Sequence, residues 1–214
     1  MRTLLRFSDR THAGRYLARS LGAYADRGDV VILGLPRGGI PVAAEVARAL
    51  DAPLDVLVVR KLGMPGQEEL AMGAIAAGGT RIINQELMRA LDVDSEELDN
   101  IIAREQVELT RRERAYRGGR APIELHGRTV ILVDDGLATG ATMRAAVQAA
   151  RMAGAIHVVA AAPVGSEQAC RELRTAADEV VCPLQPPEFH AISQWYDEFS
   201  QTSDAEVQAL LSKT

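Results

Sequence analysis

The sequence has few of the residues that mark secreted, zinc-binding or nucleic-acid-binding proteins. Only two cysteines occur, Cys170 and Cys182, and neither lies in a CxxC pair or near a histidine cluster, so no disulfide framework or zinc site can be read from them. Lysine is limited to Lys61 and Lys213, and arginine carries almost all of the positive charge. The net charge of −5 argues against DNA as a partner, because non-specific DNA affinity comes mainly from lysine and arginine.

Long apolar runs are also missing. Residues 1–15 carry charge every few positions and lack the apolar stretch of a secretory signal, and the longest apolar run, at 155–165, is too short to span a bilayer. We therefore expect a cytoplasmic protein that does not bind membranes. The 214 residues, 47% of them apolar, are enough for one compact core, and we predict a single domain over 1–214.

Short apolar runs without polar alternation predict strands that are buried on both faces. They occur at 30–35, 55–59, 130–134, 156–164 and 179–182, and helical patterns at 7–21, 41–50, 141–153 and 166–177 alternate with them. This alternation is typical of a doubly wound α/β fold with a mostly parallel sheet. We predict two appendages to it: a helical insertion at 84–120, with its long helix at 94–116, and a small C-terminal hood at 183–214.

The most informative segment is VILVDDGLATGAT at 130–142. A buried strand delivers Asp134 and Asp135 at its carboxyl end, which is where open α/β sheets bind ligands. The glycine-containing turn that follows places backbone N–H groups and the hydroxyls of Thr139 and Thr142 at a helix N-terminus, which suits a phosphate. Adjacent carboxylates can accept hydrogen bonds from vicinal hydroxyls, so the pattern predicts a site for a ribose 5-phosphate.

Acidic residues also follow strands in metal-dependent phosphatases and in response-regulator receiver domains. A receiver domain would need a phospho-accepting aspartate at the end of a later strand. The corresponding neighbourhood, VVCPLQPP, contains none.

Residues 130–142 resemble the signature of type I phosphoribosyltransferases, which bind 5-phosphoribosyl 1-pyrophosphate. By this resemblance Asp134 and Asp135 hold the ribose hydroxyls, and the turn holds the 5′-phosphate through Ala138, Thr139, Gly140, Ala141 and Thr142. The whole chain is similar to a group of uncharacterised bacterial phosphoribosyltransferases that open with an F-x-D-R-x-x-A-G-x-x-L-A helix, here Phe7 to Ala18. The fold implied is that of the type I family, with a hood over the acceptor.

A second motif, GLPRGGIPVA at 34–43, places a glycine pair and Arg37 after the first strand. Glycines let the backbone approach an anion, and an arginine can form forked bonds to it. The motif is similar to the family's pyrophosphate loop, in which an unusual backbone conformation, often a non-proline cis peptide, presents amides to the leaving group. This loop would consist of Leu35, Pro36, Arg37, Gly38 and Gly39. A plain tight turn with a solvated arginine is the alternative.

A third motif, at 58–74, carries Arg60 and Lys61 after the second strand. It is similar to the family's flexible loop, from which Lys61 would neutralise the leaving group; a surface pair beside a mobile loop is the alternative. The pattern leans weakly toward the adenine branch. Ala138 stands where hypoxanthine–guanine enzymes carry an aspartate that accepts a proton, so the general base would come from elsewhere, for instance Glu68 or Glu69.

Aromatic residues make up only 4% of the chain, yet several gather at 186–196. Phe189 and Trp195 could stack on a planar heterocycle as the acceptor site, or could simply hold the cap together. The arginines that end the 94–116 helix are interpreted as a solvated run at a helix C-terminus, with polyanion binding as the alternative.

The resemblance implies a Mg²⁺-dependent transfer of a phosphoribosyl group from 5-phosphoribosyl 1-pyrophosphate to a small-molecule acceptor. The acceptor would be a nucleobase, the protein a homodimer, and the catalytic residues Asp134, Asp135, Lys61 and Arg37. No residue is predicted as a dedicated protein ligand for the metal. The alternative function is a non-catalytic sensor that uses the same pocket to control a partner, including an RNA-binding attenuator.

Overall fold

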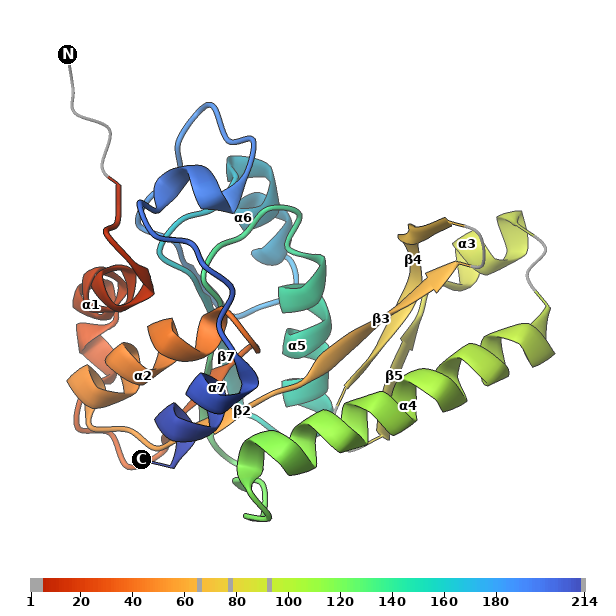
Figure 1. Ribbon diagram of the computed structural model, residues 1–214, viewed down its shortest axis with the longest axis horizontal. Helices are drawn as coiled ribbons and strands as arrows, with labels where there is room; N and C mark the ends of the chain where they lie inside the picture. Colours follow the sequence, from red (N-terminus) through yellow and green to blue (C-terminus); the bar gives the residue numbers. More distant parts are fainter. Residues whose placement is uncertain (1–5, 65–66, 77–78, 92–93, 213–214) are drawn as a thin grey trace.

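The described residues form two β-sheets, one parallel with five strands and one antiparallel with three (Figure 1). The computed structural model describes residues 6–64, 67–76, 79–91 and 94–212. In the parallel sheet the spatial order is β2-β1-β6-β7-β8. The strands are β1 (Val30–Gly34), β2 (Leu54–Val56), β6 (Thr129–Val133), β7 (His157–Ala161) and β8 (Glu179–Val181). This sheet and its flanking helices confirm the predicted doubly wound α/β fold.

Helices cover both faces of the parallel sheet, which explains why its strands are mostly apolar. Along β1, Ile32 packs into the core on the face that α1 and α2 cover, whereas Val31 and Leu33 pack on the face that α5 and α6 cover (Figure 1). The helices are α1 (Arg10–Ser20), α2 (Gly39–Leu50), α5 (Ala141–Met152) and α6 (Glu167–Leu173), with a short 3₁₀ turn, η1 (Gly22–Tyr24), after α1.

The strand order reverses between β1 and β6. From β1 the chain moves to β2 on one side and later returns to β6 on the other, with Gly34 and Val133 paired at the carboxyl ends. Loops that leave such neighbouring strands in opposite directions open a crevice that commonly binds ligands. Both glycine-containing motifs of the sequence begin at this point.

The second sheet is formed by β3 (Val59–Met64), β4 (Gln67–Ala76) and β5 (Thr80–Ile83). The loop predicted across 58–74 is therefore wrong, because its described residues pair as strands. Gly63 marks a bulge, since the β3–β4 register shifts on both sides of it. Lys61 consequently lies within β3 and does not follow the second strand of the parallel sheet.

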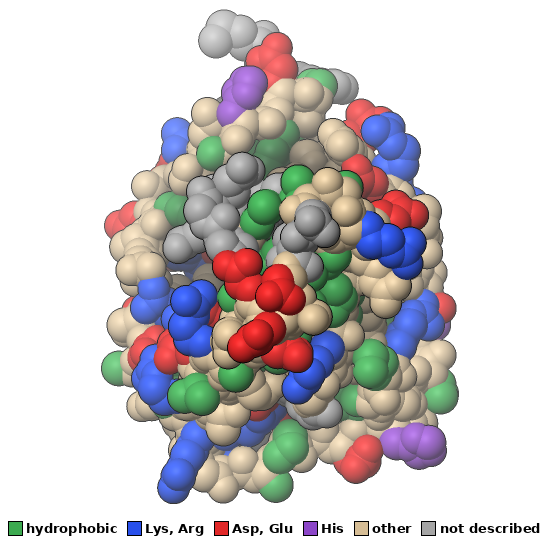
Figure 2. Space-filling view, turned by 90° about the vertical axis from the view of Figure 1, so that its right-hand side faces the viewer, with side chains coloured by type: hydrophobic (Ala, Val, Ile, Leu, Met, Phe, Trp, Pro, Cys, Tyr) green, Lys and Arg blue, Asp and Glu red, His purple; other side chains and the backbone are tan. Residues whose placement is uncertain are grey.

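The small sheet is covered by α4 (Ser95–Arg117), which follows the short helix α3 (Gln85–Ala90). Leu62, Ile75 and Ile102 belong to one buried cluster that joins the small sheet, α4 and the main core. The long helix predicted at 94–116 is confirmed. Its first turn carries exposed carboxylates that favour the positive end of the helix dipole, on the face where Figure 2 shows acidic side chains gathered.

The C-terminal segment forms η3 (Ile192–Trp195) and then α7 (Asp204–Leu211). Helix α7 begins with a capping box between Ser203 and Glu206 and buries Val207 and Leu211 in the main core. Helix α7 lies beside α2 (Figure 1). Its first residue, Asp204, approaches Arg37 in the loop that follows β1. No helix within the described ranges is long and apolar enough to cross a membrane.

Candidate functional site

Two adjacent carboxylates lie at the carboxyl end of β6. Asp135 is 8% exposed, and the Asp134 Oδ1 atom accepts a hydrogen bond from the Asp135 backbone N–H at 2.9 Å. Burial raises the pKa of the Asp134 carboxyl well above its usual value, and the charge of Asp135 raises it further. Burial also raises the pKa of Asp135, although the Arg10 guanidinium opposes that shift. The pair is therefore costly to keep charged in the absence of a ligand.

The turn after the carboxylates leads directly into α5. Gly140 precedes the helix with φ +71°, a conformation that glycine adopts without steric cost. Neighbouring backbone supports the turn, since the Leu137 N–H donates to the Val164 carbonyl at 2.9 Å and the Ser166 hydroxyl donates to the Ala138 carbonyl at 2.8 Å. The first N–H groups of α5 have no partner within the helix, which suits an anion; the Ala141 N–H donates to the Thr139 hydroxyl at 3.4 Å.

A pocket of about 180 Å³ joins Asp134, the turn and the small sheet. Lys61 reaches it from β3 and Ile192 from η3, although they lie far from the turn in sequence. The lining residues are Lys61, Asp134, Gly136, Leu137, Ala138, Thr139, Gly140, Ala141, Thr142, Met143 and Ile192. The structure thus brings together the first carboxylate, the turn and the one described lysine that the sequence singled out.

The second glycine motif packs directly against the carboxylates. The peptide bond between Pro36 and Arg37 is cis, as the sequence analysis expected for this segment. A Cβ atom on Gly38 would lie 2.0 Å from the Asp135 Oδ2 atom, and a Cβ atom on Gly39 would lie 2.6 Å from a backbone carbonyl of β6. Only glycine leaves room for this contact, so the loop and the carboxylate pair form one continuous surface.

Arg37 is placed differently from the other predicted site residues. Its guanidinium lies 3.7 Å from the Asp204 carboxylate at the start of α7, which also accepts a hydrogen bond from the Tyr116 hydroxyl at 3.0 Å. It does not line the pocket that contains Lys61. Its contact with a leaving group therefore stays a prediction.

Arg10 is a residue of the site that the sequence analysis missed. Its Nε atom donates to the Asp135 Oδ2 atom at 2.9 Å, and the two side chains are 12% and 11% exposed. Arg10 is the first residue of α1, far from Asp135 in sequence, and no local spacing pattern relates the two. Only its place in the F-x-D-R helix opening marked it.

The aromatic residues of the C-terminal segment pack mainly on one another. Trp195 is buried in a cluster with Phe7 and Tyr196, and Phe189 packs partly buried against the same cluster. Neither Trp195 nor Phe189 lines the pocket of Lys61, whereas Ile192 does. Stacking of an acceptor on Phe189 or Trp195 stays a prediction, and the structure adds Ile192 as a hydrophobic wall beside the carboxylates. The side chains of Glu68 and Glu69, named as candidate general bases, lie outside what the structure describes.

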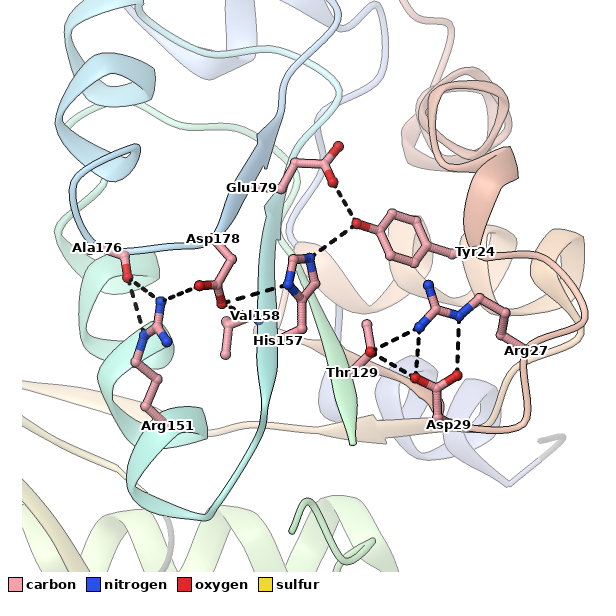
Figure 3. Close-up of polar contacts among 10 residues, drawn as sticks. All are labelled: Tyr24, Arg27, Asp29, Thr129, Arg151, His157, Val158, Ala176, Asp178 and Glu179. Atoms are coloured by element: carbon pink, nitrogen blue, oxygen red, sulfur yellow. Dashed lines mark hydrogen bonds and ion pairs between the residues drawn. The ribbon is translucent and has the colours of Figure 1, made fainter. Parts of the chain in front are cut away.

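A second polar cluster lies at the opposite, amino-terminal edge of the parallel sheet (Figure 3). The Tyr24 hydroxyl donates to the Glu179 carboxylate at 2.5 Å and contacts the His157 ring, while Arg151 pairs with Asp178 at 3.1 Å. These groups connect α5, β7 and β8 with the segment after α1, and each has a partner. We interpret this cluster as structural.

Most of the arginines at and just after the end of α4 are likewise engaged within the chain. Arg112 pairs with Glu108 at 2.7 Å, and Arg117 pairs with the buried Asp55 at 3.1 Å. Arg120 donates to a backbone carbonyl of α7 at 2.5 Å. These contacts favour a structural role for this run over a polyanion surface.

Comparisons with known proteins agree with this geometry. The phosphoribosyl transferase domain family matches residues 9–198. A Mycobacterium tuberculosis protein that is named as a phosphoribosyl transferase, Rv0571c, is 50% identical over 207 residues, which cover 97% of this chain and 46% of that protein. The chain therefore spans about half the length of the curated relatives it matches.

Solved structures show the same fold. The crystal structure of TT1426 from Thermus thermophilus is 42% identical, covers 98% of this chain and 99% of its own, and superposes with a TM-score of 0.86. A hypoxanthine-guanine phosphoribosyltransferase from Bacillus anthracis, 13% identical with a TM-score of 0.50, covers 87% of this chain and 85% of its own. The second likeness concerns the fold alone.

Proposed function

Because the chain belongs to the phosphoribosyl transferase domain family, we propose that it transfers the phosphoribosyl group of 5-phosphoribosyl 1-pyrophosphate to a nitrogenous acceptor and releases pyrophosphate. One observation carries this proposal. Asp134, the turn that follows it and Lys61 converge on one pocket at the carboxyl end of β6, although Lys61 comes from a separate segment of the chain.

Each group has a role that its chemistry supports. Asp134 and Asp135 accept hydrogen bonds from the ribose hydroxyls, and the N–H groups at the start of α5, with Thr139 and Thr142, hold the 5′-phosphate. Lys61 and the amides of the 35–39 loop offset the charge of the departing pyrophosphate while an acceptor ring nitrogen attacks C1 of the ribose. The chain mainly positions the reactants and stabilises charge.

The site also fits a divalent cation. Asp134 is a half-buried carboxylate that makes no ion pair among the described residues, which favours a bound cation. No group of three or more acidic, histidine or cysteine side chains in the described part of the chain could hold a metal by itself. Mg²⁺ commonly binds through one or two carboxylates together with substrate phosphates, so Asp134 would hold it jointly with the substrate. When bound, Mg²⁺ would neutralise charge on the leaving pyrophosphate.

The acceptor is proposed to be a nucleobase, with purines tested first because of the lean toward the adenine branch. Ile192, which lines the pocket, and Phe189 or Trp195 of the same segment are proposed to contact its faces. A homodimer is proposed as the assembly.

The test is release of pyrophosphate from 5-phosphoribosyl 1-pyrophosphate by the protein with Mg²⁺ and each of a panel of nucleobases. Release that depends on one base, and that Asp134→Asn abolishes, would support the transferase. Binding of the sugar phosphate without release with any base would favour a sensor. A protein that does not bind it at all would refute both.

A further inference from the structure

We propose that Arg10 is a positioning residue of the sugar site, which orients the Asp135 carboxylate toward a ribose hydroxyl. This inference rests on the proposed function, since it assumes that Asp135 contacts the sugar. It goes further by assigning a role to a residue at the start of α1 that belongs to neither glycine motif.

The guanidinium of Arg10 is fixed at two points. Its Nε atom donates to the Asp135 Oδ2 atom at 2.9 Å, and its Nη1 atom donates to the Ser200 carbonyl at 2.7 Å. Because the guanidinium is planar and rigid, two hydrogen bonds in different directions define its plane. The fixed plane in turn holds the Asp135 Oδ2 atom in one position, because that atom accepts a hydrogen bond from the guanidinium.

The surroundings of Arg10 hold it in place. Its guanidinium carbon lies 4.1 Å from the centre of the Phe199 ring, within the range of a cation–π contact. The Tyr196 hydroxyl donates to the Asp135 backbone carbonyl at 2.6 Å, so the same segment also fixes the main chain of Asp135. The second carboxylate is thus held at its side chain and its backbone by residues remote in sequence.

The arrangement distinguishes the two carboxylates. Arg10 is the one described side chain that donates a hydrogen bond to the Asp135 carboxylate, and Asp134 accepts only from a backbone N–H. The Oδ2 atom of Asp135 is therefore occupied, and a sugar hydroxyl would bind to the rest of that carboxylate. This predicts that Arg10 affects recognition of a hydroxyl group and not of the phosphate.

The experiment uses ribose 5-phosphate and its 2-deoxy and 3-deoxy analogues as probes, with dissociation constants measured by titration calorimetry. The variants are Arg10→Gln, Arg10→Lys and, as a matched control on the same helix, Arg15→Gln, whose side chain is 66% exposed in a pair with Glu45. Thermal unfolding of each variant checks that the fold is kept.

We expect Arg10→Gln to bind ribose 5-phosphate about tenfold more weakly or worse, because a hydrogen bond between charged groups is lost. It should also lose most of the preference of the wild type for ribose 5-phosphate over at least one analogue. Arg10→Lys should have an affinity and a preference between those of the wild type and Arg10→Gln, because lysine keeps the charge but not the planar fork. Arg15→Gln should resemble the wild type.

Equal loss of affinity for all three sugars in Arg10→Gln would indicate a merely structural role and would overturn the inference, as would unchanged preference. If Arg10→Gln does not fold, the affinities of Arg10→Lys for the three sugars are compared with those of the wild type, and the same outcomes support or overturn the inference. Failure of the wild type to bind ribose 5-phosphate, or to prefer it over either analogue, would instead count against the proposed function.

Discussion

Replacement of Gly38 by alanine tests the contact between the two motifs most directly. Gly38 has φ −61° and ψ −32°, a conformation that alanine adopts easily, so the backbone itself does not oppose the change. The added Cβ atom, however, would lie 2.0 Å from the Asp135 Oδ2 atom and 3.2 Å from the Arg10 Nε atom. An ordinary contact needs at least 3.4 Å, so the carboxylate or the loop must shift by about 1.4 Å.

A shift of this size would disrupt the 2.9 Å hydrogen bond between Arg10 and Asp135. Hydrogen bonds to charged groups contribute about 1.5–3 kcal/mol, which corresponds to roughly 10- to 150-fold in a binding constant. We therefore expect Gly38→Ala to weaken binding of ribose 5-phosphate by up to that factor, measured by titration calorimetry. It should also lower the thermal midpoint, because the same hydrogen bond is present in the protein without ligand. Gly22→Ala is the matched control, since a Cβ atom there would meet nothing within 4 Å. If Gly38→Ala binds as tightly as Gly22→Ala, the close packing of the loop on the carboxylate is wrong.

Three further predictions concern charge. Asp134→Asn should raise the free energy of unfolding at pH 7, by about 1.4 kcal/mol for each unit by which the pKa of Asp134 is raised. A raised carboxyl pKa means that the charged form opposes folding at any pH above the pKa of the unfolded chain, near 4. Urea unfolding should therefore show the gain shrinking as the pH falls toward 4, and a variant that is less stable than the wild type at pH 7 would contradict the prediction. Lys61→Met should lower kcat/KM about tenfold or more in the pyrophosphate-release assay while leaving ribose 5-phosphate binding unchanged, and an equal loss in both would place Lys61 at the sugar phosphate instead. The hydrogen bond from Arg27 lowers the pKa of Asp29 to about 2 (Figure 3). The stability that this bond adds should be present above about pH 4 and lost as the pH falls toward 2. The difference in unfolding midpoint between the wild type and Asp29→Asn should therefore close over that interval, and a constant difference would refute the role of the Arg27–Asp29 pair.

Local patterns in the sequence were sufficient to predict the parallel sheet and the turn at 136–142. A strand buried on both faces has to be apolar throughout, and a turn that enters a helix with a left-handed residue favours glycine, as at Gly140. Both constraints act within a few residues of chain. The α/β fold, the long helix α4 and the position of the candidate site beside Asp134 could therefore be predicted without the tertiary structure.

The small sheet could not be predicted from the sequence, because its glycines and short apolar runs resemble a loop until β3, β4 and β5 pair. That pairing is what carries Lys61 into the pocket. Arg10 and Ile192 likewise reach the carboxylates from opposite ends of the chain, and Arg37 is turned toward Asp204 because α7 packs beside its loop. Contacts between residues that are dozens of positions or more apart leave no periodic trace along a single chain, so the partners of the carboxylates emerge only once the chain is folded.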